Sequence, residues 1–106
     1  MATTRGDYAK VSITDGNETT VLEVSRWRGK VGRSTFKCRA SLAGTLRVYF
    51  IDRDGVTAGN LETSETLTAD TLTALDFDLA IPRYKVTFQR TGGSGTGTCA
   101  VEVFDY

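Results

Sequence analysis

The chain has 106 residues, of which 40% are hydrophobic and 25% are charged. These values are close to those of an average soluble domain, so they indicate neither disorder nor a membrane location. Thirteen basic residues balance thirteen acidic ones, so the net positive charge of most nucleic-acid-binding domains is absent and nucleic acid is not an expected partner. No apolar run is long enough for a transmembrane helix or a signal peptide, so we expect no membrane partner and synthesis in the cytoplasm.

The N-terminal residues differ from the rest of the chain. Residues 1–7 are polar and are expected to form a flexible arm, followed by one domain over residues 8–106. From residue 8 onwards apolar and polar residues alternate, which is the pattern of strands with one face towards a core.

The first alternating segment ends at Ile13, and the second begins at Val21. Asp15-Gly16 lies between them, and this dipeptide between two alternating segments predicts a β-hairpin. Val21 and Leu22 are both apolar, so the register of the second strand stays open by one residue.

Two further strands follow after a loop. They are expected around Phe36–Ser41 and Leu46–Ile51, with Ala43-Gly44 between them, and we expect them to pair as a second hairpin. The pattern then weakens over residues 56–70, which predicts a long surface connection with a short strand around Glu65–Thr68.

The last part of the chain returns to clear alternation. A strand around residues 75–79 ends before Pro82, which cannot donate a hydrogen bond to a sheet. The next strand covers residues 84–88, and the glycine-rich segment Thr91–Thr98 predicts a hairpin loop before the last strand, Cys99–Phe104.

Strands that recur about every ten residues without a helical segment predict an all-β fold. We expect an antiparallel β-sandwich or jelly roll of about seven to eight strands. The alternation predicts that the following side chains are buried: Phe36, Val48, Phe50, Phe77, Val86, Phe88, Val101 and Val103.

The residue types that support catalysis are scarce. The chain has no histidine, which excludes a histidine-based triad and the commonest transition-metal ligand. The nearest carboxylate pairs, Asp76 with Asp78 and Asp52 with Asp54, are typical of strand edges and turns. We therefore expect no enzyme activity, no cofactor and no metal site. Cys38 and Cys99 are expected as buried free thiols, with a bridge between two sheets as the alternative.

Charge is distributed unevenly along the chain. The middle third is basic and is followed by an acidic segment from Asp54 to Asp78. Because tryptophan and arginine commonly provide the energetic centre of protein interfaces, the basic segment is the predicted contact region. The candidate interface residues are Arg26, Trp27, Arg28, Lys30, Arg33 and Tyr49.

The chain resembles small structural proteins of tailed bacteriophages, in particular head decoration or cement proteins. The resemblance is carried by the polar arm, the Thr- and Gly-rich alternating strands, the strand Tyr84-Lys85-Val86-Thr87-Phe88, the glycine loop and the strand Cys99–Phe104. It matches no motif residue by residue, so it transfers no functional residues.

The resemblance implies a virion subunit that binds other virion proteins and copies of itself, often as a trimer, at the head or tail surface. We therefore expect a non-enzymatic structural protein located in the virion, which acts through protein–protein contacts. The alternative is a carbohydrate- or receptor-binding β-sandwich that uses exposed aromatic residues, for which the candidates are Trp27, Tyr8, Tyr49 and Tyr84.

Overall fold

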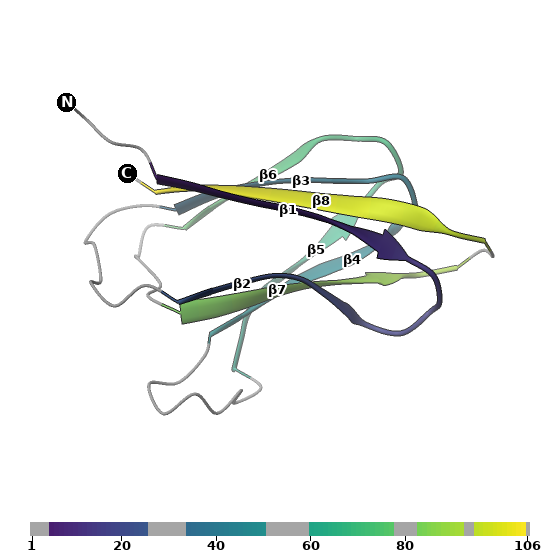
Figure 1. Ribbon diagram of the computed structural model, residues 1–106, viewed down its shortest axis with the longest axis horizontal. Coiled ribbons are helices and arrows are strands. Elements are labelled where there is room, and N and C mark those ends of the chain that lie inside the picture. Colours follow the sequence, from purple (N-terminus) through teal and green to yellow (C-terminus); the bar gives the residue numbers. More distant parts are fainter. Residues whose placement is uncertain (1–4, 26–33, 51–59, 78–82, 93–94, 106) are drawn as a thin grey trace.

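The computed structural model describes residues 5–25, 34–50, 60–77, 83–92 and 95–105. These residues form eight strands (Figure 1). The strands are β1 (Arg5–Ile13), β2 (Thr19–Ser25), β3 (Ser34–Ala40), β4 (Gly44–Phe50), β5 (Asn60–Leu67), β6 (Thr73–Phe77), β7 (Arg83–Arg90) and β8 (Gly97–Asp105). No helix that could cross a membrane occurs in the described part of the chain.

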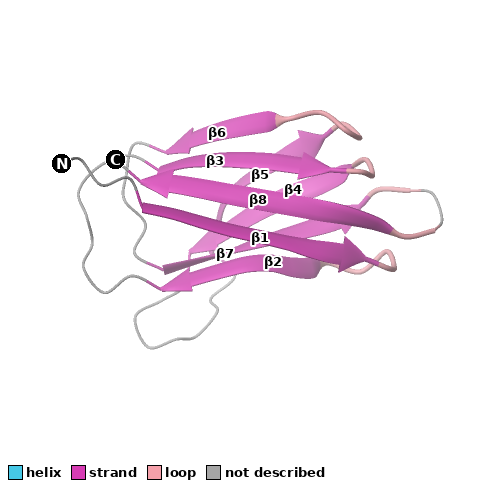
Figure 2. Ribbon diagram, turned by 45° about the horizontal axis from the view of Figure 1, so that its top comes forward, coloured by secondary structure: helices cyan, strands magenta, loops and turns pink. Residues whose placement is uncertain are grey.

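The strands form two four-stranded antiparallel sheets that face each other (Figure 2). Sheet A has the order β1-β8-β3-β6, and sheet B has the order β2-β7-β4-β5. The expected all-β sandwich is confirmed. Successive strands mostly alternate between the sheets, which is the connectivity of an eight-stranded jelly roll.

The three expected hairpins are wrong. β1 pairs with β8 while β2 pairs with β7, and β3 pairs with β6 and β8 while β4 pairs with β5 and β7. β7 and β8 likewise belong to different sheets. Alternation shows which face of a strand is buried, but it does not show which strand lies beside it. A tight turn can also connect two strands that belong to different sheets. Among the described strands, β4 and β5 are the consecutive pair that forms a ladder.

β5 is longer than the short strand expected around Glu65–Thr68. It lies at the edge of sheet B, and its inner face carries Thr63 and Glu65, both half-buried, beside the fully buried Leu67. Inward-facing polar and charged residues are a common feature of edge strands, where they oppose pairing with other chains. This polarity weakened the strand pattern in the sequence.

The first two strands also differ from their expected limits. β1 begins at Arg5, which pairs with Asp105, so the strand includes the last three residues of the expected arm. In β2 the ladder with β7 shifts between Thr20 and Leu22. This β-bulge at Val21 explains why the register of the segment was open in the sequence, because two successive apolar residues can both face the core at a bulge.

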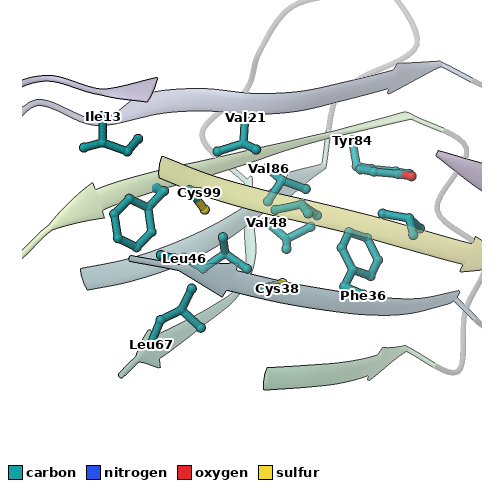
Figure 3. Packing of buried hydrophobic residues seen from close by; sticks show 14 residues of the cluster. Ile13, Val21, Phe36, Cys38, Leu46, Val48, Leu67, Tyr84, Val86 and Cys99 are labelled. Atoms are coloured by element: carbon teal, nitrogen blue, oxygen red, sulfur yellow. The ribbon is translucent and has the colours of Figure 1, made fainter. Parts of the chain in front are cut away.

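The core lies between the sheets (Figure 3). Burial is confirmed for these expected core residues: Phe36, Val48, Val86, Phe88, Val101 and Val103. The side chains of Phe50 and Phe77 lie outside the described part of the structure. Phe36 of sheet A meets Tyr84 of sheet B edge-on, with ring centroids 5.2 Å apart at 61°, which joins the two layers.

The turns at one end of the sandwich are bound to one another. The amide of Ser41 donates to the Thr98 carbonyl at 2.9 Å, and the amide of Asp70 donates to the Ala40 carbonyl at 2.7 Å. Thr91 donates from its amide to the carbonyl of Ala43 at 3.2 Å. These contacts connect the β3–β4 turn to the neighbouring connections and hold this end of the sandwich together.

Candidate interaction surfaces

Only one of the six candidate interface residues lies in the described structure. Tyr49 is in β4 of sheet B, whereas Arg26, Trp27, Arg28, Lys30 and Arg33 lie outside the described residues. The described cations of the basic middle third are divided between the sheets. Lys37 and Arg39 are in β3 of sheet A, and Arg47 is in β4 of sheet B. The sandwich therefore has two outer faces to consider.

Face A is the outer face of sheet A, formed by Tyr8, Lys10, Lys37, Arg39, Ala100 and Glu102. The register places these residues in two rows across three strands. In one row Glu102 lies between Tyr8 and Lys37, and in the other Ala100 lies between Lys10 and Arg39.

Face A presents its long side chains to solvent. Tyr8 is 61% exposed, and Lys10, Lys37 and Arg39 are exposed as well. Among these six residues three are cations and Glu102 is a carboxylate, and Arg39 donates from Nη2 to the carbonyl oxygen of Asp70 at 3.1 Å. A sheet surface with one exposed tyrosine and a small alanine between two cations is suited to contact with an acidic protein surface.

Face B is the outer face of sheet B around Arg47, Tyr49, Lys85, Thr87 and Gln89. Its strands place Arg47 opposite Thr87 and Tyr49 opposite Lys85. Lys85 lies with its Nζ 5.5 Å from the centroid of the Tyr49 ring, a cation–π distance. These side chains therefore form a connected group on two paired strands.

Glu18 connects a loop to face B. It precedes β2 and accepts hydrogen bonds at Oε2 from the hydroxyl of Tyr49 at 2.7 Å and from that of Thr87 at 2.5 Å. Its Oε1 lies 3.5 Å from Nη1 of Arg47. The same Arg47 nitrogen donates to Oε1 of Gln89 at 3.0 Å. The carboxylate is thus held by two hydroxyl groups and one guanidinium.

A second contact fixes the same loop. Nε2 of Gln89 donates to the carbonyl oxygen of Gly16 at 3.0 Å. Within the loop, the amide of Asn17 donates to Oδ1 of Asp15 at 2.9 Å, which is an Asx turn. The β1–β2 connection consequently lies against the outer surface of β7 and β4.

The network sets the ionisation of its own members. Partial burial acts to raise the pKa of Glu18, but the hydrogen bonds from Thr87 and Tyr49 and the charges of Arg47 and Lys85 outweigh it, so the pKa is lowered. Burial and the hydrogen bond to Glu18 raise the pKa of Tyr49. Glu18 is therefore an ionised acceptor near neutral pH, and Tyr49 is a neutral donor.

The two cysteines are free and buried, which confirms the expectation of free thiols. Both are in sheet A, in β3 and β8, so a bridge between the two sheets is excluded. Burial raises the pKa of each thiol to about 12. The neutral thiols behave as small hydrophobic groups of the core.

The aromatic candidates for a sugar platform have different positions. Tyr84 is fully buried, so it cannot stack on a sugar. The Tyr49 ring is covered by Lys85 and its hydroxyl is bound to Glu18. Tyr8 is exposed, and Trp27 lies outside the described residues. Within the described ranges, no group of three or more His, Cys, Asp or Glu residues could hold a metal ion.

Several residues of these faces were not identified from the sequence. Alternation does place Lys85, Thr87 and Gln89 opposite the buried Tyr84, Val86 and Phe88. Their contact with Tyr49 and Glu18 depends on the pairing of β4 with β7 and on the path of the β1–β2 connection. Neither feature leaves a local signal in the sequence.

Comparison with known proteins shows the fold but no family. No protein-family model matches the chain, and no curated protein matches it. Among solved structures it is similar to PirA, with a TM-score of 0.64 and 16% identity over 93% of each chain. It is also similar to the SPBc2 prophage-derived protein YomS, with a TM-score of 0.50 and 19% identity over 98% of each chain. The chain shares its fold with these two proteins over nearly its whole length.

Proposed function

We propose that the chain is a non-enzymatic structural subunit of a phage virion and that it binds a neighbouring virion protein through face A. The observation that carries this proposal is the exposed Tyr8 beside the exposed cations on the outer surface of sheet A. Tyrosine and arginine are enriched among the residues that dominate binding energy at protein interfaces. An acidic surface on the partner complements Lys10, Lys37 and Arg39.

The reactive groups of the described residues also favour a binding role. Both thiols are buried with a pKa of about 12, so they are poor nucleophiles near neutral pH. The Glu18 carboxylate is held ionised by hydrogen-bond donors and cations, so it is a poor proton donor at neutral pH. Neither observation supports a role of these thiols as nucleophiles or of Glu18 as an acid.

The phage context has two supports. Jelly rolls are frequent in viral capsid proteins, and one protein of the same fold is described as prophage-derived. Both supports are analogies of fold, and a fold hosts many functions. The surface chemistry of face A therefore has to be tested directly.

The test compares two exposed hydrophobic side chains in the context of the virion. Tyr8 on face A and Leu72 in the β5–β6 connection are 61% and 62% exposed, so their alanine variants lose similar accessible side chains. Virions of the encoding phage are purified after complementation with wild type, Tyr8→Ala or Leu72→Ala. The copy number of the chain per virion is then measured by quantitative mass spectrometry.

We expect wild type and Leu72→Ala to be incorporated equally, and Tyr8→Ala to be retained at least about tenfold less after dilution of the particles, as for an interface hot spot. Melting temperatures of the isolated variants show that each is folded. Absence of the wild-type chain from virions would contradict the virion role. Equal retention of all three proteins would contradict the role of face A.

A further inference from the structure

The side chains around Glu18 hold its carboxylate as a binding site would hold a carboxylate ligand. Among the described residues, the side-chain groups that hold the carboxylate come from β4 and β7, two central strands of sheet B. The carboxylate itself comes from the connection between β1 and β2. A rigid sheet therefore presents the donors, and a loop delivers the acceptor.

The donors match the chemistry of a single carboxylate. Arg47 provides a cationic nitrogen, and Tyr49 and Thr87 provide hydroxyl groups that meet at the same Oε2 atom. Lys85 adds positive charge nearby. Thr87 is only 2% exposed, so the floor of this site is buried. Hydrogen bonds from charged and hydroxyl donors to a carboxylate are among the stronger ones in proteins.

The described contacts between the loop and face B include no backbone ladder of the sheet. The ladder between β2 and β7 begins at Thr19, one residue after Glu18. The loop residues before Thr19 contact face B at two points. Side chains of sheet B bind the carboxylate of Glu18 and the carbonyl oxygen of Gly16. The donors on β4 and β7 are positioned by backbone pairing that does not involve the loop.

We propose that Arg47, Tyr49, Lys85 and Thr87 form a carboxylate-binding site that Glu18 fills within the free chain, and that an acidic side chain of a partner protein replaces Glu18 when it binds. The inference goes beyond the contact surface on face A, because it concerns the other sheet and a different set of residues. It assigns face B to a protein ligand that presents an Asp or Glu side chain.

A protein carboxylate fits this site better than a carboxylated sugar. Sugar-binding sites commonly use an open aromatic ring, but Lys85 lies over the ring of Tyr49. Tyr49 and Thr87 meet at one carboxylate oxygen of Glu18 and Arg47 approaches the other, which is the arrangement expected for a single carboxylate. Glu18 competes from within the chain at a high effective concentration, so the partner needs additional contacts to displace it.

The test removes Glu18 and supplies a small carboxylate in its place. Glu18→Ala is titrated with sodium propionate, whose carboxylate and two aliphatic carbons correspond to those of a glutamate side chain. Sodium chloride keeps the ionic strength constant, and backbone amide shifts of β4 and β7 are followed by NMR. Wild type and the double variant Glu18→Ala/Arg47→Met are the controls. Glu18→Ser is a second variant with an opened site, for use if the alanine variant does not fold.

We expect saturable amide shifts around Arg47 and Thr87 in Glu18→Ala, with an apparent affinity at least about tenfold higher than in wild type, where Glu18 competes. Glu18→Ala/Arg47→Met should show no saturation. A folded Glu18→Ala protein that gives no saturable shifts would overturn the proposal and leave Glu18 as a structural contact. Saturation that persists without Arg47 would overturn the site. Tighter binding of glucuronate than of propionate would overturn the assignment to a protein ligand.

Discussion

The two outer faces of the sandwich carry the same types of residue in different states. Face A has Tyr8, Lys10, Arg39 and Glu102, and face B has Tyr49, Lys85, Arg47 and Glu18. On face A the tyrosine and the cations are exposed to solvent. On face B the tyrosine and the arginine are bound to the glutamate.

The two faces differ because their carboxylates belong to different kinds of element, a strand on face A and a connection on face B. Glu102 belongs to a strand of sheet A, so its side chain stands beside those of its neighbours. Glu18 belongs to a connection, which carries its carboxylate onto the donors of sheet B. The loop that carries Glu18 therefore closes the donors of face B, whereas on face A the loop contact is a single hydrogen bond from Arg39 to the Asp70 carbonyl among the described residues.

The largest expected effect comes from a change beneath both faces. Phe36 joins the sheets through its contact with Tyr84 and is fully buried. Phe36→Ala should lower the free energy of unfolding by about 3 to 5 kcal/mol, because it leaves a cavity between the layers. Denaturant unfolding measures this loss. Phe36→Leu, which keeps much of the volume, should cost less, and equal losses for the two variants would contradict the packing argument.

A smaller effect should separate the two faces. A Cβ atom at Gly44 would collide with the Phe88 ring and lie 2.5 Å from the Gln89 carbonyl oxygen. Gly44→Ala should therefore cost about 1 to 3 kcal/mol by overpacking. The displacement of β4 against β7 should change NMR shifts on face B more than on face A.

The matched control for this change is Gly16→Ala, since no heavy atom lies within 4 Å of a Cβ at Gly16. Gly16→Ala should leave the free energy of unfolding within about 0.5 kcal/mol of wild type. A Gly44→Ala protein as stable as this control would show that the β4–β7 contact is less tight than the structure indicates.

The smallest expected effect is the loss of the stabilisation that the Glu18 contacts provide on face B, and it depends on pH. Glu18→Gln should cost about 1 kcal/mol or less near pH 7, because the carboxylate is partly exposed. The folded state lowers the pKa of Glu18 below 4.5, so the stabilisation is present above that value and is lost as the pH falls through the folded pKa. Chemical denaturation of both proteins between pH 3 and about pH 7 should show the difference vanish in acid.

The corresponding change on face A is Glu102→Gln, which should alter the free energy of unfolding by no more than about 0.5 kcal/mol. A Glu18→Gln difference that stays constant from pH 7 down to acid would show that the charge of Glu18 does not stabilise the fold. Equal effects of the two variants would remove the contrast between the faces.

The sequence predicts the face of a strand on which a candidate residue lies, but it does not predict the distant residues that this side chain contacts. Alternation along β4 is sufficient to place Tyr49 on the face opposite the buried Val48, because that assignment needs only the period of two along a strand. Its partners Glu18 and Thr87 lie 31 and 38 residues away along the chain, as their residue numbers show. Contacts over such separations depend on strand order, which alternation does not specify.

The sequence by itself determined the strand content and much of the core of this protein. Alternation defined which side of β3, β4, β7 and β8 is buried, since every second side chain of a strand points the same way. The turn residues between strands were also identifiable. These features are local, and each depends on a few adjacent residues.

The tertiary structure alone decided which strands pair and which face is closed. A turn such as Asp15-Gly16 permits either a hairpin or a crossing between sheets, and the choice depends on how all eight strands bury their apolar faces together. That choice placed β7 beside both β2 and β4 and carried Glu18 onto Arg47, Tyr49 and Thr87. The closed state of face B is therefore a property of the assembled sandwich, because its donors and its acceptor meet only when both sheets have formed.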